Sequence, residues 1–147
     1  MISLPLQPKI IKKDKNSAVF EIEALYPGYG VTVGNSMRRV LLSSLEGAAI
    51  TQVKIKGAQH EFSTIPGVLE DTILLMLNLK QLRFKIYADE PQKAKLSVKG
   101  EREVRGSDIT LPPHVEILNK SAHIATLTAK SAELEMELVI EKGLGYQ

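Results

Sequence analysis

Three glycines lie just before and near the start of the first segment with helical hydrophobic spacing, and their pattern comes closest to a phosphate-binding motif. Gly28, Gly30 and Gly34 follow a predicted strand. A dinucleotide-binding fingerprint needs G-x-G-x-x-G directly after a strand, and an acidic residue about 20 positions later. Here the third glycine comes one residue late, and no acidic residue follows in the right strand context. The spacing therefore disfavours phosphate binding, and turn and packing roles explain the glycines better.

His60 and Glu61 begin like the H-E-x-x-H motif of zinc proteases, but the motif is incomplete. The position that should carry the second histidine is Thr64, and the chain has no cysteine. The other histidines, His114 and His123, are far away along predicted strands. Because a zinc site needs three or four such ligands brought together, the sequence predicts no metal site.

No other group of residues predicts catalysis. Ser43, Ser44 and Ser63 lack the G-x-S-x-G context of a serine nucleophile. Glu70 and Asp71 are adjacent in a predicted helix, so their side chains point about 100° apart and do not converge on one substrate. We therefore expect no catalytic residue and no cofactor.

Composition indicates an ordinary globular protein. The chain has 147 residues, of which 44% are hydrophobic and 24% are charged, and its net charge is +2. Its longest unbroken apolar run, Ile73 to Leu77, is far shorter than the about 20 residues of a membrane span. Two alternatives stay open: a small enzyme with a phosphate ligand at the glycine-rich turn, and a modest nucleic-acid binder. The lysines that would serve the second are Lys9, Lys12, Lys13, Lys15, Lys93, Lys95 and Lys99.

Hydrophobic periodicity predicts the elements that position these residues. A period of two indicates strands at 17–25 and 49–56, and a helical period indicates helices at 32–45 and 68–80. Glu70 and Asp71 are expected in the first turn of the second helix, where the helix dipole favours acidic residues. The rest is almost wholly β, with strands near 82–86, 94–98, 114–118, 123–127 and 132–140. The predicted class is α+β, mainly antiparallel, with two helices.

The helix at 32–45 has two distinct faces. On a helical wheel its apolar residues share one broad face with two small residues. This face consists of Val33, Gly34, Met37, Val40, Leu41, Ser44 and Leu45. Arg38 lies at its edge, and Asn35, Arg39 and Leu42 lie together on the other side. Two readings remain: a core helix with solvated arginines, which wheel geometry alone favours, or a helix with two contact surfaces.

Several motifs together resemble the alpha subunits of bacterial and plastid RNA polymerases. The most specific are residues 29–47 (YGVTVGNSMRRVLLSSLEG) and 60–67 (HEFSTIPG). The same order and spacing hold for Glu70-Asp71, for residues 77–82 (LNLKQL) and for residues 141–146 (EKGLGY). The resemblance covers nearly the whole chain and is weakest between residues 88 and 109.

The resemblance implies a discontinuous fold and a scaffold function. It places residues 1–50 and 138–147 in an incomplete two-layer dimerisation subdomain, and residues 51–137 in an inserted, mainly antiparallel β subdomain. It implies a non-catalytic subunit that dimerises and binds the beta and beta-prime subunits to start assembly of DNA-directed RNA polymerase. Such a subunit is cytoplasmic and associated with the nucleoid, or it belongs to a plastid.

The resemblance also assigns residues to surfaces. It overturns the core-helix reading and makes the apolar face of helix 32–45 the dimer interface. The residues that it assigns to beta-subunit binding are Asn35, Arg38, Arg39, Leu42, Ser43, His60, Glu61, Glu70, Asp71, Gly143, Gly145 and Tyr146.

Two departures from the family pattern limit these expectations. Leu144 stands between the terminal glycines, where the family usually has arginine. Family members also continue beyond this length into strands, a long helix and a DNA-binding domain. We therefore expect a weakened homodimer and no direct promoter contact from this chain.

Overall fold

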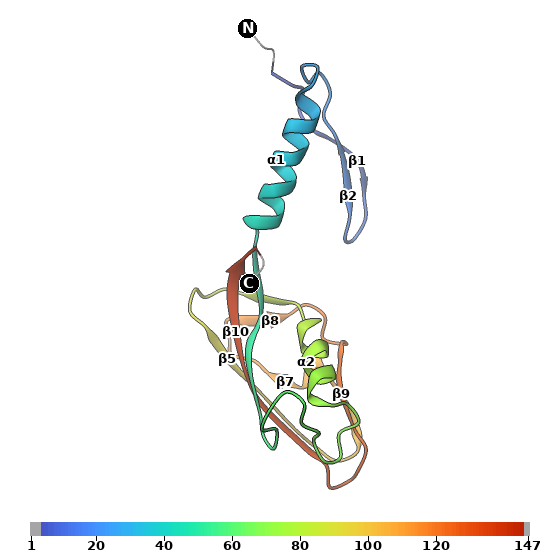
Figure 1. Cartoon of the computed structure of the whole chain (residues 1–147), viewed down its shortest axis with the longest axis vertical. Coiled ribbons are helices and arrows are strands. Elements are labelled where there is room, and N and C mark those ends of the chain that lie inside the picture. The colour runs from blue at the N-terminus through green and yellow to red at the C-terminus, as the bar shows by residue number, and fades with distance from the viewer. Residues whose placement is uncertain (1–3, 146–147) are drawn as a thin grey trace. The chain divides into compact units, whose positions relative to one another are not determined.

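The computed structural model describes residues 4–145, which form two compact units (Figure 1). The first unit, called unit 1, ends at Leu45, and unit 2 runs from Glu46 to Gly145. All buried hydrophobic residues among those described lie in unit 2, between Ile55 and Ile140. The hydrophobic core of the described chain therefore belongs to unit 2.

Unit 1 consists of a β-hairpin and one helix. Strands β1 (Lys9–Lys13) and β2 (Ala18–Glu21) pair antiparallel. Helix α1 (Tyr29–Ser43) follows, and its N-cap is Gly28 with a φ of 88°. Glycine adopts this left-handed conformation without strain, so the turn can end at Gly28. The helix begins at Tyr29, three residues before its predicted start at Thr32.

Unit 2 is built on a four-stranded antiparallel sheet with the order β3-β10-β5-β7. Its strands are β3 (Glu46–Ile55), β5 (Gln92–Lys99), β7 (Ile109–Thr110) and β10 (Glu133–Leu144). Strand β10 is central and alternates between buried apolar and outward acidic residues. The buried residues are Leu134, Met136, Leu138 and Ile140. This period of two is the pattern of a sheet with one face on the core, as the sequence predicted.

Two smaller antiparallel pairs and a helix complete unit 2. Strand β4 (Phe84–Ile86) pairs with β8 (Val115–Ile117), and β6 (Arg102–Arg105) pairs with β9 (His123–Leu127). A 3₁₀ turn at Gly106–Asp108 separates β6 from β7. Helix α2 (Thr72–Lys80) buries Thr72, Leu75 and Leu79. The α+β class with mainly antiparallel strands and two α-helices is confirmed.

The predicted start of the second helix at Val68 is wrong. Val68 forms an isolated antiparallel bridge with Leu127, and α2 begins only at Thr72. Asp71 is the N-cap, and its carboxylate accepts the Leu74 N–H at 2.7 Å. Glu70 and Asp71 therefore lie before the first turn of α2. The Asp71 cap and the Val68 bridge satisfy backbone groups that would otherwise bond within a longer helix.

The predicted subdomain boundaries differ from the boundary between the compact units. Unit 2 begins at Glu46, and residues 138–144 pair with β3 and with part of β5 inside that unit. The sequence assigned residues 1–50 and 138–147 to a dimerisation subdomain and residues 51–137 to its insert. This assignment stays a prediction.

Candidate functional site

Helix α1 and the residue that follows its C-cap form an exposed apolar surface, although such residues usually pack into a core. No residue of α1 is buried. Four large apolar residues of the predicted dimer face, on α1 and at Leu45, are between 50% and 62% exposed. They are Met37, Val40, Leu41 and Leu45. We call this set the α1 apolar surface. Exposed apolar patches are typical of interaction surfaces.

Gly34 has open space around it within the described residues. A Cβ added at Gly34 would meet no atom within 4 Å. Glycine in a helix costs about 1 kcal/mol relative to alanine, so this position has no reason within unit 1 to be glycine. Val33, another residue of the predicted dimer face, is half-buried. The Ser44 Oγ lies 3.1 Å from the Ser43 Oγ, and the Ser43 Oγ donates to the Arg39 carbonyl at 2.7 Å.

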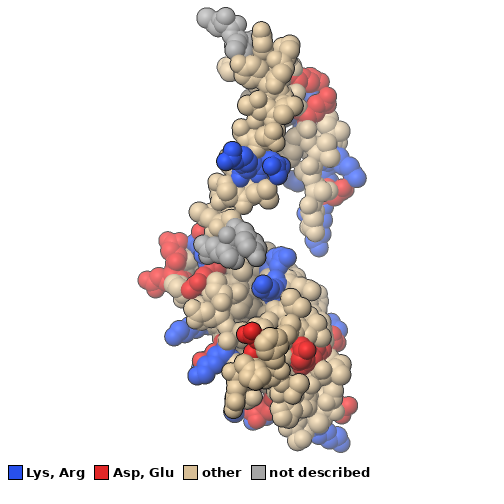
Figure 2. Space-filling view, viewed as in Figure 1, with Lys and Arg blue, Asp and Glu red and all other residues tan. Residues whose placement is uncertain are grey.

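The two arginines of α1 present their charges to solvent. Arg38 and Arg39 are exposed and form no ion pair within residues 4–145. Figure 2 shows the basic side chains of α1 as a blue group surrounded by uncharged surface of that helix. Asn35 and Leu42 are exposed on the same helix. Arginine is enriched at protein–protein interfaces and among the residues that contribute most of the binding energy.

The loop before α2 exposes a second group of predicted site residues. His60 and Glu61 are exposed, and Phe62 beside them is 70% exposed. The Ser63 Oγ accepts the His60 N–H at 3.2 Å, which closes a tight turn. The Ser63 carbonyl accepts the Thr72 hydroxyl at 2.6 Å, so this turn is tied directly to the first residue of α2.

Glu70 occupies a different environment, because its side chain is 6% exposed and fully used inside unit 2. Its carboxylate accepts the Thr126 N–H at 2.7 Å and the Thr126 hydroxyl at 3.2 Å. The His123 Nε2 lies 2.8 Å from the same carboxylate, and the His123 Nδ1 lies 3.0 Å from Glu103. The Arg105 guanidinium donates to Glu103 at 2.8 Å. Glu70 therefore has an internal structural role, and its predicted partner contact stays a prediction.

These contacts shift the pKa values of the group. Burial by itself would raise the pKa of Glu70, but the hydrogen bonds from Thr126 and His123 outweigh it and hold that pKa below its ordinary value. The hydrogen bond to Glu70 raises the pKa of His123; burial opposes this, and Glu103 adds to it. The hydrogen bonds from Arg105 and His123 lower the pKa of Glu103.

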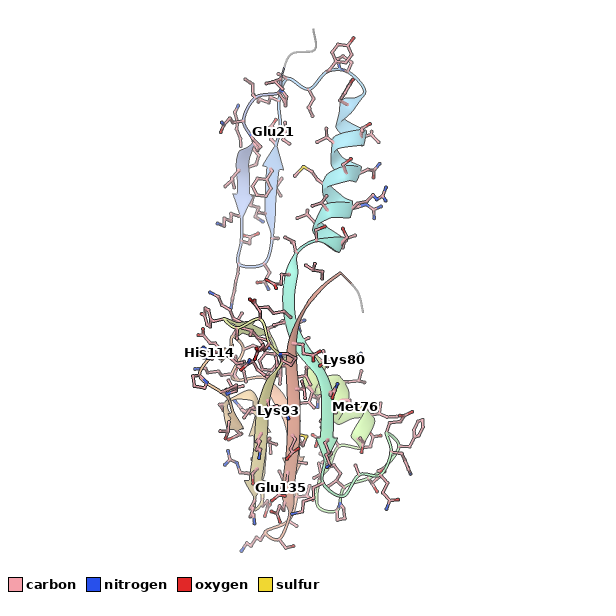
Figure 3. All side chains as sticks on the ribbon, turned by 90° about the vertical axis from the view of Figure 1, so that its left-hand side faces the viewer. Glu21, Met76, Lys80, Lys93, His114 and Glu135 are labelled. Carbon is pink, nitrogen blue, oxygen red and sulfur yellow. The ribbon has the colours of Figure 1, made fainter. Side chains whose placement is uncertain are left out.

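The outer side of α2 adds apolar surface near the exposed loop. Ile73, Leu74 and Leu77 are exposed, whereas Leu75 and Leu79 point into the core. Met76 and Lys80, labelled in Figure 3, line a small hollow between α2 and residues 50–53 of β3. A helix that is apolar on nearly every side is typical of an element with neighbours on more than one face.

The end of β10 contains the last predicted site residues. Gly143 pairs with Gly47, and Leu144 pairs with Glu46. Gly145 has a φ of 68°, which glycine adopts without strain. Tyr146 lies outside the described residues.

The lysines of the sheet do not form an uncompensated basic surface. Lys56 pairs with Glu135 at 2.8 Å, and Lys99 pairs with Glu133 at 3.0 Å. Lys93 and Glu135, labelled in Figure 3, belong to the neighbouring strands β5 and β10. Because carboxylates alternate with these lysines, this face lacks the charge pattern of a nucleic-acid site.

Residues 4–145 contain no cluster of three or more His, Asp or Glu side chains with the geometry to hold a metal ion. No helix in this part of the chain is both long and apolar enough to cross a membrane.

The predicted site residues thus occupy three segments: α1, the loop before α2, and the end of β10. Sequence reasoning missed His123 and Glu103, which the structure joins to Glu70. The only signal was the alternation of Glu103 and Arg105 in a stretch with few apolar residues. The pairing of β6 with β9 that brings Glu103 to His123 depends on a register that the sequence does not specify.

Unit 2 is an α+β domain, with an antiparallel sheet and the helix α2. Residues 53–147 match the family model described as the RNA polymerase Rpb3/RpoA insert domain. The chain belongs to this family.

Comparison with individual proteins gives closely related sequences. The chain is 49% identical over 138 residues to the DNA-directed RNA polymerase subunit alpha of Roseiflexus sp. (strain RS-1), which covers 94% of this chain and 43% of that protein. It is 54% identical over 127 residues to the protein of the same name from Lawsonia intracellularis, covering 86% of this chain and 36% of that protein. The chain spans less than half the length of these relatives.

Proposed function

We propose that the chain functions in DNA-directed RNA polymerase as a non-catalytic assembly scaffold, which self-associates and binds the beta and beta-prime subunits. The α1 apolar surface is the observation that carries this proposal, because it exposes four large apolar side chains. The names of the relatives supply the complex.

The apolar face of α1 is the proposed dimer surface. Burial of exposed apolar area is the main favourable contribution to most protein–protein association. Gly34 and Ser44 lie on this face, and small residues there allow the backbone of a second copy to come close. The open space around Gly34 supports this role, because nothing in the described chain fills it.

The arginine side of α1 is the proposed contact with the beta subunit. Arg39 and Arg38 are exposed and form no ion pair within the described residues, and Leu42 lies on the same helix with its side chain exposed. The loop with His60 and Glu61 is the second proposed contact, since Phe62 beside it adds exposed apolar surface.

The dimer proposal is tested by Leu41→Asp, which introduces a charge into the α1 apolar surface. We expect the variant to sediment as a monomer at concentrations where the unmodified chain self-associates. Leu118→Asp is the control, because Leu118 is 62% exposed and lies in unit 2. Equal self-association of the unmodified chain and Leu41→Asp would refute this interface.

The beta-subunit proposal is tested by Arg39→Ala. An arginine at the centre of an interface contributes about 2 kcal/mol or more, so we expect at least an approximately 30-fold loss of affinity for the isolated beta subunit. Lys93→Ala removes an exposed cation from the sheet of unit 2 and should bind as the unmodified chain does. Unchanged binding by Arg39→Ala would contradict the assignment.

A further inference from the structure

Strand β3 lies at one edge of the four-stranded sheet, where its only hydrogen-bonded neighbour in that sheet is β10. The Lys56 N–H donates to the Glu135 carbonyl at 3.0 Å. In an antiparallel pair, residues whose backbone groups face the partner strand alternate with residues whose backbone groups face away. The backbone groups of Lys54 therefore point toward β10, and those of Val53 and Ile55 point to the opposite edge.

This opposite edge of β3 has unpaired backbone groups. The Ile55 carbonyl is used in a turn, where it accepts the Ala58 N–H at 3.3 Å. Within residues 4–145, the Val53 N–H, the Val53 carbonyl and the Ile55 N–H form no hydrogen bond. Open N–H and C=O groups along a sheet edge are a template for one more strand. The edge thus offers the groups to which an extended segment would bond.

An apolar hollow lies beside the same edge. Its lining includes Ile50 and Val53 of β3, and Met76 and Leu79 of α2 (Figure 3). Ile50 and Val53 are half-buried, whereas Thr51 between them is exposed. Because side chains alternate between the two faces of a strand, an added strand would direct every second side chain toward this apolar side of the sheet.

Charges on the outer face of the sheet alternate from strand to strand. Lys95 of β5, Glu137 of β10 and Lys54 of β3 stand at one level of the ladder. Lys56 of β3 pairs with Glu135 of β10 at 2.8 Å, whereas Lys54 forms no ion pair within the described residues. Opposite charges on neighbouring strands stabilise a sheet, and like charges destabilise it. The position next to β3 is therefore complementary to carboxylates.

The same lysines disfavour a second copy of β3 at this edge. Lysine on an edge strand is a common protection against the pairing of identical edges. Two paired β3 edges would place Lys54 and Lys56 of both copies on one face, where like charges repel. An acidic strand has the opposite effect, so the charges favour one class of partner over self-association.

We propose that the open edge of β3 binds an extended segment of a partner protein, in which acidic residues alternate with apolar ones, as an added strand of the sheet. The backbone of this segment bonds to Val53 and Ile55. Its acidic side chains lie beside Lys54 and Lys56, and its apolar side chains cover the hollow. The surface includes no residue assigned above to dimerisation or to the beta subunit, so the inference goes beyond the proposed function.

The probe is a peptide with the sequence of residues 133–141 (ELEMELVIE), because β10 has the proposed alternation and pairs with β3 at its other edge. A peptide with lysine in place of each glutamate is the charge control. Amide hydrogen exchange of the intact chain is followed by nuclear magnetic resonance. We expect the acidic peptide to protect the Val53 and Ile55 amides, and the lysine peptide to bind about 10-fold more weakly or worse. No protection of Val53 at the highest soluble concentration of acidic peptide, or equal binding of both peptides, would overturn the proposal.

Two variants test the edge itself. Lys54→Glu reverses a charge beside the added strand, so affinity for the acidic peptide should fall by about 3- to 10-fold. Lys93→Glu makes the same change on β5 and should bind as the unmodified chain does. Val53→Pro removes the N–H at the open edge and leaves the pairing with β10, because that N–H faces away, and it should abolish binding. Equal affinities of Lys54→Glu and Lys93→Glu would overturn the proposal even if Val53→Pro fails to fold.

Other occupants of the edge give distinct results. Protection of Val53 that rises with the concentration of the chain, without peptide, would make a second copy the occupant and overturn the assignment to an acidic segment. Loss of protection at the amides of β10 would mean that the peptide replaces that strand instead of adding to the edge, which would also overturn it.

Discussion

Glu70, which the sequence predicted as a contact residue, has its hydrogen-bond partners within unit 2. Its carboxylate satisfies the Thr126 N–H and hydroxyl and pairs with His123, while 6% of the residue is exposed. The adjacent Asp71 is exposed and caps α2. Two neighbouring acidic residues in one family-like motif therefore have different structural roles.

Glu70→Ala should destabilise the protein by about 2–4 kcal/mol. The substitution leaves the Thr126 N–H and the His123 ring without their acceptor, and unsatisfied partly buried donors are costly. Urea unfolding at pH 6 measures the loss. Glu61→Ala is the matched control, since Glu61 is exposed and an exposed substitution typically changes stability by less than about 0.5 kcal/mol. Equal effects of the two substitutions would contradict the assigned network.

The stability contributed by this network should depend on pH within a definite window. The pKa of Glu70 falls below its ordinary 4.5 on folding, so its contribution is complete above about pH 4.5 and is lost as the pH falls through the folded value. The pKa of His123 rises above 6.5, so its contribution is complete below about pH 6.5 and is lost as the pH rises through the folded value.

The difference in free energy of unfolding between the unmodified chain and Glu70→Ala should therefore be largest between about pH 4.5 and 6.5. It should decline at pH 8 without vanishing, because Thr126 still donates to Glu70. Urea unfolding of both proteins from pH 3.5 to 8.5 measures this profile. A difference that grows steadily with pH up to 8 would have the wrong sign.

At the scale of elements, the segment before α2 lies closely against the end of the β9–β10 connection. Gly67 has a φ of 77°, and a Cβ there would lie 2.7 Å from the Ala132 Cβ. Val68 and Leu69 are joined to β9 by backbone contacts, so the segment has little freedom to move away.

Gly67→Ala should consequently destabilise the protein by about 1–3 kcal/mol more than Gly100→Ala. Gly100 has a similar φ of 85° but no atom within 4 Å of an added Cβ. The backbone penalty is therefore common to both variants, and only Gly67→Ala adds a steric clash. Thermal unfolding of the two variants gives the comparison, and equal melting temperatures would show that the segment moves away easily.

The strands of unit 2 were predictable where one face is buried. Leu134, Met136, Leu138 and Ile140 alternate with outward residues in β10, and this period determines both the strand and its inner face. Strand β6 was missed because, of its four residues, Arg102–Arg105, only Val104 is buried. The start of α2 was placed too early because Val68 and Leu69 have helical spacing but bond to β9, a tertiary contact that local pattern does not contain.

The candidate site was predictable in part for the same reason. Helix α1 and its apolar residues follow from spacing, and the structure leaves them exposed. The roles given to Arg39 and to His60 came from the family resemblance and stay predictions. The contacts of His123 with Glu70 and Glu103 depend on strand register and on long-range pairing, which a single sequence does not determine.

At the scale of the whole molecule, the two units differ in how their apolar residues are used. Every buried hydrophobic residue among those described belongs to unit 2, whereas the apolar residues of α1 are exposed or half-buried. Hydrophobic burial is the main source of folding free energy, so unit 2 should contain nearly all of it. Unit 1 should accordingly contribute little of it.

A fragment of residues 46–147 should therefore fold alone, with a free energy of unfolding within about 1 kcal/mol of the whole chain. A fragment of residues 1–45 should lack cooperative unfolding, because a two-stranded hairpin and one helix without a buried core are marginal in water. Urea unfolding followed by circular dichroism distinguishes the two fragments. The unmodified chain serves as the control, and its main transition should coincide with that of the larger fragment.

A fragment 46–147 that remains unfolded would show that residues 1–45 contribute to the core. The location of folding free energy in unit 2, and with it the interpretation of α1 as an interface element, would then be wrong.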